Sequence, residues 1–565
     1  MLHDPTNAHI TRWDRAIIVL VSIFVLYNVI WSAAPLRNAF LTWNPVLLVI
    51  ALVQPLLACV VFVAFSLFRI HEAIPVLINL GIPFTLGLLT LLALGAHGVV
   101  FRTINPTMTL ELGLFVIFFL LVTVGIAFAV DRRNSLSYWG TVYWKIALMT
   151  FAIAWLARKP SDFSLVARVM TLCGALIGSI AIYNRLAGID LVEGSRVTIG
   201  RDIKSALGDP NDLCLTLLFP FGFAAAMAML KPTRTDMLIG RACAPILILS
   251  IIFTQSRGGL LGILAIAAIF GSRFIKSRAA LLVVGAVCAG ALFLAMGIGG
   301  RSSGGLTEWG SGDLDASAGD RMNAWRAAVR MALAKPLTGV GVLNFPENFY
   351  FYTDTWIGKA IAVHSTWLGV LAETGFVGFF VYVAMVLACL RSCLKSVAVA
   401  SEREDVAPGL ATTARGLLAA LVGFIVAGSF LTQGFTWPPY ILVGLTSALG
   451  IYTQGLSQQS SAGPSQVAPS ARELFTRCGH TGRNHLRHGA SSLFAIGCVF
   501  LGGNVPPAHA DAPLSRSIEP AAAVRYSEDH ELILEDIVEG VTADPADPMD
   551  SQEEAAPVIY PSAEV

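Results

Sequence analysis

The sequence predicts an all-α polytopic membrane protein with about 12–13 transmembrane helices and one large loop on the outer side. Of its 565 residues, 55% are hydrophobic and only 13% are charged. Soluble proteins carry roughly 25% charged residues, so this shortage of charge indicates a chain embedded in lipid. The apolar residues also gather in long runs, which short polar segments and a single long hydrophilic segment separate.

The apolar runs are of the length that a membrane requires, because about 20 apolar residues in a helix cross the hydrocarbon core. The predicted spans are residues 16–34, 45–69, 74–95, 107–130, 139–157, 164–185, 211–230, 241–254, 258–270, 278–297, 365–390, 415–433 and 437–454. The short runs 241–254 and 258–270 predict either two tilted spans joined by a tight hairpin or a broken helix pair that lines a cavity. We divide the chain into N-terminal transmembrane helices over 1–185 and a core over 186–454.

Lysine and arginine residues in the short loops predict the orientation of the chain, because they favour the cytoplasmic side. Three loops alternate consistently with a cytoplasmic position, and they contain Lys231, Arg234, Arg241, Arg273, Lys276, Arg278, Arg391, Lys395, Arg403 and Arg415. Segments 186–210, 254–257 and 298–364 are then expected on the outer face, together with Arg132 and Arg133. The direction of the N-terminal spans stays open, because counting back leaves an odd number of them.

Residues 298–364 form the long hydrophilic loop. Within it, an apolar stripe at helical spacing predicts an amphipathic helix that could lie in the membrane surface, and Pro336 is expected to end this helix. The stripe consists of Met322, Trp325, Val329 and Leu333. An aromatic run follows between 345 and 356, and we interpret it either as a surface that stacks on sugars or as rings at the membrane interface.

The chain changes character after residue 454. Residues 455–483 are rich in Ser, Gln and Gly, which is typical of a linker. An apolar segment near 491–510 follows basic residues and ends in Ala508-His509-Ala510, so it resembles a secretory signal peptide. The whole of 455–565 is predicted to be a disordered tail.

Several basic residues fall on the expected outer face, next to predicted spans. His364 directly precedes the span 365–390, and imidazole is suited to deprotonating a hydroxyl near neutral pH. Arg257 lies between two apolar runs, Arg321 begins the loop helix, and Arg196 and Arg201 lie in the loop 186–210. Guanidinium groups bind phosphate oxygens, so the set predicts a site for a lipid diphosphate and an acceptor hydroxyl. Taken singly, each residue also fits a structural role at the interface.

Glu373 is a further candidate, because it is a carboxylate inside the span that follows His364. It could orient a partner or act in catalysis, and the sequence leaves both interpretations open. The nine cysteines include no CxxC pair, and seven of them lie in or beside apolar runs, where they fit helix packing. We therefore expect neither a disulfide framework nor a cysteine-based zinc site. The net charge of +1 gives no indication of a nucleic-acid partner.

Four short motifs occur in order along the expected outer face. They are Gly208-Asp209-Pro210-Asn211-Asp212; Arg257-x3-Leu261; Arg321, Trp325 and then Pro336-Leu337-Thr338-Gly339-Val340-Gly341; and His364-Ser365-x9-Gly375-x2-Gly378. In these motifs, over about residues 190–390, the chain resembles the bacterial O-antigen ligase and polymerase family.

The resemblance implies a GT-C-like membrane glycosyltransferase in the bacterial inner membrane. Its donor would be a glycan on a polyprenyl-diphosphate carrier such as undecaprenyl diphosphate, and its active site would face the periplasm. No cofactor and no metal would take part, and membrane lipids would surround the protein. The products would be cell-surface polysaccharides or glycoconjugates such as lipopolysaccharide.

The resemblance also implies roles for individual residues. His364 would be the base that activates the acceptor hydroxyl, and Arg257 and Arg321 would bind the diphosphate. Arg196 and Arg201 are positioned like further outer-loop basic residues of the family. Glu373, Gly375 and Gly378 would support the site.

The acceptor stays open between the lipid A-core, a protein and the end of another glycan chain. A polysaccharide polymerase of the same family is the alternative enzyme. A lipid-linked-sugar flippase or transporter is the alternative from another class. No clear internal repeat is visible, and the polar candidates gather on one face, which favours surface chemistry over passage.

Overall fold

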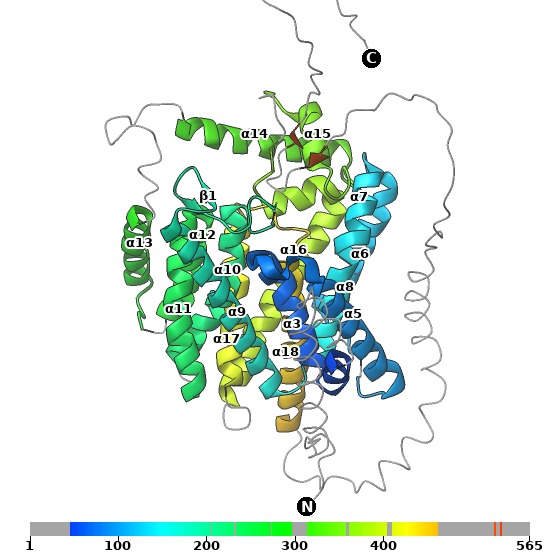
Figure 1. Ribbon diagram of the computed structural model, residues 1–565, viewed down its shortest axis with the longest axis vertical. Coiled ribbons are helices and arrows are strands. Elements are labelled where there is room, and N and C mark those ends of the chain that lie inside the picture. Colours follow the sequence, from blue (N-terminus) through cyan, green and yellow to red (C-terminus); the bar gives the residue numbers. More distant parts are fainter. Residues whose placement is uncertain are drawn as a thin grey trace, which may run out of the picture.

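The computed structural model of the protein describes residues 46–295, 313–356, 361–403 and 409–461, apart from 105, 204, 231–232 and 273, and two short strands near the C-terminus. Long helices run side by side in one bundle, and shorter helices cover one of its ends (Figure 1). Apart from two strand pairs, every regular element of this part of the chain is helical. The predicted all-α polytopic fold is therefore confirmed.

The helices of the first half are α3 (Pro55–Leu67), α4 (Ile70–Ala73), α5 (Ile82–Gly95), α6 (Leu110–Gly125), α7 (Arg132–Tyr138), α8 (Trp144–Leu156) and α9 (Pro160–Ala187). Those of the second half are α10 (Pro210–Leu230), α11 (Arg234–Thr254), α12 (Arg257–Gly271), α13 (Arg278–Ala295), α14 (Asp313–Ala334), α15 (Phe345–Tyr352), α16 (Thr366–Glu402), α17 (Leu410–Gly428) and α18 (Trp437–Ser461). The 3-10 and π-helical turns are η1 (Pro75–Leu80), η2 (Ala96–Val100), η3 (Ile126–Phe128) and η4 (Trp139–Tyr143). The strands β1 (Leu191–Val192) and β2 (Arg196–Val197) pair antiparallel, as do β3 (Arg525–Tyr526) and β4 (Leu532–Ile533).

Within the described residues, 7 helices are long and apolar enough to cross a membrane, fewer than the predicted number of spans. They are Ile82–Val100, Leu110–Phe128, Pro160–Ala187, Pro210–Leu230, Arg234–Thr254, Thr366–Glu402 and Leu410–Gly428. The predicted span 45–69 consists of two helices bent by 114° where Pro55 interrupts the backbone hydrogen bonds. The predicted span 139–157 consists of the π-helical turn η4 followed directly by α8, which has 13 residues.

Some predictions concern residues outside the described part. The predicted span 16–34 lies there, as does most of the predicted tail 455–565 with its signal-peptide-like segment. α18 continues to Ser461, so its helix extends past the predicted core boundary at residue 454.

The centre of the bundle is formed by α10 and α17, which are the most buried of the spanning helices. Their backbones approach closely at Gly222 and Gly416. A Cβ added to Gly222 would lie 2.9 Å from the Gly416 carbonyl oxygen and 2.7 Å from the backbone nitrogen of Ala420. In lipid, van der Waals packing at such small residues drives helix association, so this contact stabilises the core of the bundle.

The segments expected on the outer face meet at one end of the bundle. The β1–β2 hairpin, α7, α14 and α15 lie there, and α14 crosses the ends of the long helices (Figure 1). α14 ends before Pro336, as the sequence predicts, but it begins at Asp313 and not at Arg321, which therefore lies within the helix. It packs through a small core that contains Ala324, Ala327, Ala328, Met331, Val340, Phe345, Phe349, Ile361, Val363 and Ala372.

The predicted apolar stripe of α14 is not its buried face. Trp325 is partly buried, but Met322, Val329 and Leu333 are exposed at 46%, 39% and 64%. The small residues Ala324, Ala327 and Ala328 face the protein instead, together with Met331, because alanines allow a helix to pack closely. That this exposed stripe lies in the membrane surface stays a prediction.

We predict that Gly222→Ala lowers the stability of the bundle by about 1–3 kcal/mol, because the added Cβ overlaps backbone atoms of α17. The measurement is the melting temperature of the detergent-solubilised protein. Gly113→Ala is the matched control, since a Cβ at Gly113 in α6 meets nothing within 4 Å. There the gain in helix propensity of about 1 kcal/mol should leave stability unchanged or raised. Equal melting temperatures for both variants would contradict the contact.

Candidate active site

The turn between α11 and α12 presents Arg257 at the end of the bundle that α14 crosses. α11 ends at Thr254, and Gln255 has a left-handed backbone with φ of 53°. The Ser256 hydroxyl then accepts a hydrogen bond of 3.3 Å from the N–H of Gly259, which stabilises the start of α12. The predicted runs 241–254 and 258–270 thus belong to consecutive helices joined by a tight turn. The Arg257 side chain is exposed at the first position of α12.

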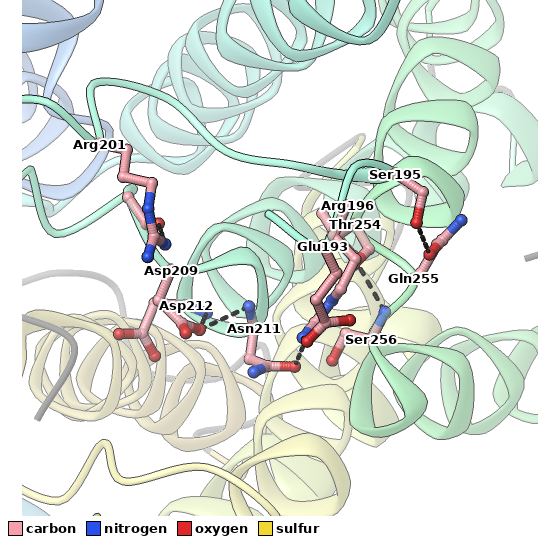
Figure 2. Close-up of polar contacts among 11 residues, drawn as sticks. Glu193, Ser195, Arg196, Arg201, Asp209, Asn211, Asp212, Thr254, Gln255 and Ser256 are labelled. Carbon is pink, nitrogen blue, oxygen red and sulfur yellow. Dashed lines mark hydrogen bonds and ion pairs between the residues drawn. The ribbon is translucent and has the colours of Figure 1, made fainter. Parts of the chain in front are cut away.

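Arg196 lies beside this turn, at the start of β2. Figure 2 shows that its guanidinium donates to the Thr254 carbonyl oxygen at 3.2 Å and to Asn211 Oδ1 at 2.9 Å. The Glu193 carboxylate lies 3.7 Å from the third nitrogen. The guanidinium is therefore fixed between the α11–α12 turn and the start of α10.

The Asp-Pro-Asn motif supplies one of these acceptors. Asp209 Oδ1 accepts hydrogen bonds from the N–H groups of Asn211 at 2.7 Å and Asp212 at 3.2 Å (Figure 2). Pro210 occupies the first position of α10, where its missing N–H has no consequence. The motif starts a span, as predicted, and its asparagine orients Arg196.

Arg321 joins Arg196 and Arg257 from a third element, α14. Burial, together with the positive charges of Arg257 and then Arg196, lowers the pKa of the Arg321 guanidinium below its ordinary value. Among the described residues, none forms a hydrogen bond or ion pair with the side chains of Arg257 or Arg321. Arg196 has the Glu193 carboxylate nearby, whereas Arg257 and Arg321 have no carboxylate partner within the described residues, so an anion would relieve the repulsion between them.

Arg201 occupies a different place in the same loop. It donates to the carbonyl oxygen of Gly208 at 3.4 Å, and in Figure 2 it lies beside Asp209 rather than beside Arg196. The structure therefore brings Arg196, but not Arg201, next to Arg257 and Arg321.

His364 directly precedes α16, in a left-handed backbone conformation with φ of 48°. Its N–H donates to Thr432 Oγ1 at 3.0 Å, and the preceding carbonyl, that of Val363, accepts from Trp325 Nε1 at 3.0 Å. Ser365 is the N-cap of α16, with its hydroxyl accepting from the N–H of Leu368. The second residue of the His-Ser pair thus starts the helix, while the first lies just outside it.

Two hydrogen bonds connect His364 with the start of α10. Thr432, the partner of the His364 N–H, is followed in the chain by Gln433, whose side-chain amide donates to Asp212 Oδ1. Asp212 is the neighbour of Asn211, which binds Arg196. The imidazole-bearing turn and the arginine group therefore belong to one polar network at the outer end.

α14 makes a second connection between His364 and the arginine group. Trp325, which binds the carbonyl before His364, lies one helical turn after Arg321. The structure thus gathers His364, Arg257, Arg321 and Arg196 at one end of the bundle, although up to 168 positions separate them in the chain (364 − 196).

Glu373 binds backbone of the outer loop. Its buried carboxylate accepts hydrogen bonds from the N–H groups of Leu343 at 2.9 Å and Phe345 at 3.1 Å. Of the two interpretations left open by the sequence, these contacts support the one in which Glu373 orients a partner.

The glycines of the His-x10-Gly-x2-Gly motif shape a kink in α16. Gly375 has φ of 68°, and a Cβ there would lie 2.5 Å from the Pro336 carbonyl oxygen. A Cβ at Gly378 would overlap the Thr374 side chain. Gly339, in the Pro-Leu-Thr-Gly-Val-Gly stretch, also has positive φ and would place a Cβ 2.5 Å from the Ala372 carbonyl oxygen. The two motifs are therefore the two sides of one close backbone contact.

Sequence reasoning missed Thr432 and Gln433. They lie in the short connection between α17 and α18, whereas the hydropathy pattern placed both of them at the end of the predicted span 415–433. Their polar side chains next to a predicted span are the feature that could have indicated a functional role. This indication is weak, because residues at the ends of spans and in loops are commonly polar.

Fold and site define a polytopic membrane protein with a cationic site at one end of its helix bundle. Residues 242–383 match the family model described as O-antigen ligase. The match confirms the resemblance that the motifs predicted, and the family supports glycosyltransferase activity of the ligase or polymerase type. No curated protein matches the chain. The matched stretch contains Arg257, Arg321 and His364, whereas Arg196 and Thr432 lie outside it.

We predict that Arg321→Gln leaves the melting temperature of the ligand-free protein unchanged or raises it. The lowered pKa of Arg321 means that its charged form is disfavoured in the folded state, so a neutral side chain removes repulsion from Arg257 and Arg196. The measurement is thermal unfolding in detergent at low salt, where repulsion between charges is least screened.

The matched control for this prediction is Arg168→Gln. Arg168 is ion-paired with the buried Asp236, so this change should lower stability by about 1–2 kcal/mol, allowing for the partial exposure of Arg168. A loss of stability in Arg321→Gln as large as that in the control would show that Arg321 has a structural partner and would contradict the prediction.

Proposed function

We propose that the protein transfers a glycan from a polyprenyl-diphosphate carrier to an acceptor hydroxyl on the periplasmic face of the bacterial inner membrane. The observation that carries the proposal is the group of three guanidiniums from β2, α12 and α14. Two of them, those of Arg257 and Arg321, have no carboxylate partner within the described residues. Guanidiniums bind phosphate oxygens in bidentate fashion, and a diphosphate offers enough oxygens for all three.

In the proposed reaction, the oxygen of the acceptor hydroxyl bonds to the anomeric carbon of the donor sugar while the His364 imidazole takes the hydroxyl proton. The bond between that carbon and the diphosphate oxygen breaks, and its electron pair leaves with the polyprenyl diphosphate. Arg257, Arg321 and Arg196 stabilise the negative charge on the leaving group. His364 then returns its proton to water, which leaves the glycosylated acceptor, the polyprenyl diphosphate and a proton.

The remaining residues have supporting roles in this proposal. Arg201 offers a further cation on the outer loop, toward the glycan part of the donor. Glu373, Gly375 and Gly378 fix the kink of α16 and the loop docked on it, which sets the position of the site. No metal is required, because the guanidiniums supply the positive charge that the leaving group needs, so transfer should continue in the presence of EDTA.

The acceptor hydroxyl belongs to the lipid A-core, a protein or another glycan chain, and the glycosylated product identifies which. Deletion of the gene separates a ligase from a polymerase. A strain without a ligase attaches no glycan, whereas a strain without a polymerase still attaches single repeat units.

We predict that His364→Ala and Arg257→Ala abolish glycan attachment in a deletion strain, because each removes a group that the transfer step needs. Both proteins should reach normal abundance in the membrane, and the lipid-linked glycan should accumulate. The measurements are glycan attachment, immunoblotting of membranes and extraction of lipid-linked glycan from the same cultures.

Arg326→Ala is the matched control, since this arginine of α14 is 61% exposed and pairs with Asp354 on the surface. It should retain full attachment. Full attachment by both His364→Ala and Arg257→Ala would refute the catalytic assignment and favour the transporter interpretation.

A further inference from the structure

The backbone of His364 is in a conformation that residues with a Cβ rarely adopt. Its φ of 48° lies in the left-handed region, where the Cβ comes close to backbone atoms. Such conformations persist only where surrounding contacts determine them, and they gather at functional sites. The contacts that determine this one should therefore also determine where the imidazole points.

Two side chains from other elements bind the backbone on either side of His364. Trp325 of α14 donates its indole N–H to the Val363 carbonyl oxygen at 3.0 Å, and Thr432 accepts the His364 N–H at 3.0 Å. The first bond fixes the peptide that enters the turn, and the second fixes the amide of the turn residue itself. Together they limit rotation about the bond that sets φ of His364.

Thr432 is itself held firmly. The hydroxyl of Thr366, in the first turn of α16, donates to the Leu431 carbonyl oxygen at 2.7 Å and accepts the N–H of Gln433 at 3.1 Å. These two bonds lie on either side of Thr432 and join its segment to the helix that His364 precedes. The Thr432 hydroxyl therefore has a fixed position relative to the start of α16.

We propose that Trp325 and Thr432 are positioning residues, which hold the His364 peptide in its left-handed turn and thereby aim the imidazole at the acceptor hydroxyl. The inference rests on the proposed function, in which His364 is the base. It assigns a role to the α17–α18 connection, which lies outside the stretch that matches the family. Neither residue needs to touch a substrate, so their loss should slow the proton transfer and leave donor binding unchanged.

The test uses the full-length protein, purified in detergent and mixed with membranes of the deletion strain, which supply both lipid-linked glycan and acceptor. The variants are Thr432→Val, which keeps the shape but loses the hydroxyl, and Trp325→Phe, which keeps an aromatic ring but loses the N–H. Each should lower kcat about tenfold or more, because small misplacements of a reacting group have large effects on rate. The apparent KM for the membranes should stay within about twofold, since binding is not altered.

Two controls separate positioning from a general structural role. Thr432→Ser keeps the accepting oxygen and should restore a rate close to that of the unaltered protein. Trp367→Phe removes an indole N–H that binds Ser429 Oγ at 2.9 Å, so it weakens the same pair of segments without touching the peptides around His364. It should leave kcat close to that of the unaltered protein. If Thr432→Val does not accumulate in the membrane, the kcat values of Trp325→Phe and Thr432→Ser test the positioning role instead.

The outcomes also separate this proposal from the proposed function. Normal kcat in Trp325→Phe or Thr432→Val, with His364→Ala inactive, would overturn the positioning role alone. Equal losses in Trp367→Phe would likewise overturn it, because they would indicate general loosening. Transfer at the full rate by His364→Ala would overturn the base assignment and with it this inference.

Discussion

The candidate site depends on a close backbone contact between the kink in α16 and the loop that follows α14. Pro336 accepts the N–H of Phe376 at 2.8 Å, and the N–H of Val340 donates to the Ala372 carbonyl oxygen at 2.9 Å. These bonds form only because Gly375 and Gly339 leave room for the two chains to meet. The contact fixes α14 relative to α16, and therefore fixes Arg321 and Trp325 relative to His364.

The arrangement of charge follows from that contact. Arg257 and Arg196 are placed by the α11–α12 turn and the start of α10, and α14 brings Arg321 toward them. The like charges of these arginines repel one another, and the packed core under α14 and α15 holds Arg321 in place. Helix packing through small residues holds the bundle together, and the segment that contains α14 and α15 packs on its end.

Sequence reasoning identified the local features of this site and missed those that depend on packing. The predicted spans 258–270 and 211–230 begin within one residue of α12 at Arg257 and of α10 at Pro210, and α14 ends before Pro336 as predicted. Hydropathy, capping residues and proline all act within a few positions. The sequence did not reveal which face of α14 packs on the protein, because the large apolar residues form the exposed stripe while mostly small ones make the contact. Within the described residues, fewer helices than predicted spans are long and apolar enough to cross a membrane, and Pro55 breaks the predicted span 45–69 into two helices bent by 114°.

By itself, the sequence determined the membrane class, the order of the helices and the O-antigen ligase resemblance, because hydropathy and short motifs are local properties of the chain. Only the tertiary structure decided that Arg196, Arg257 and Arg321 converge, that Glu373 binds backbone, and that Thr432 holds the peptide of His364. These relations join segments far apart in the chain. They depend on which helices pack together and at what depth. The periodicity within a single segment does not indicate which other segment it packs against.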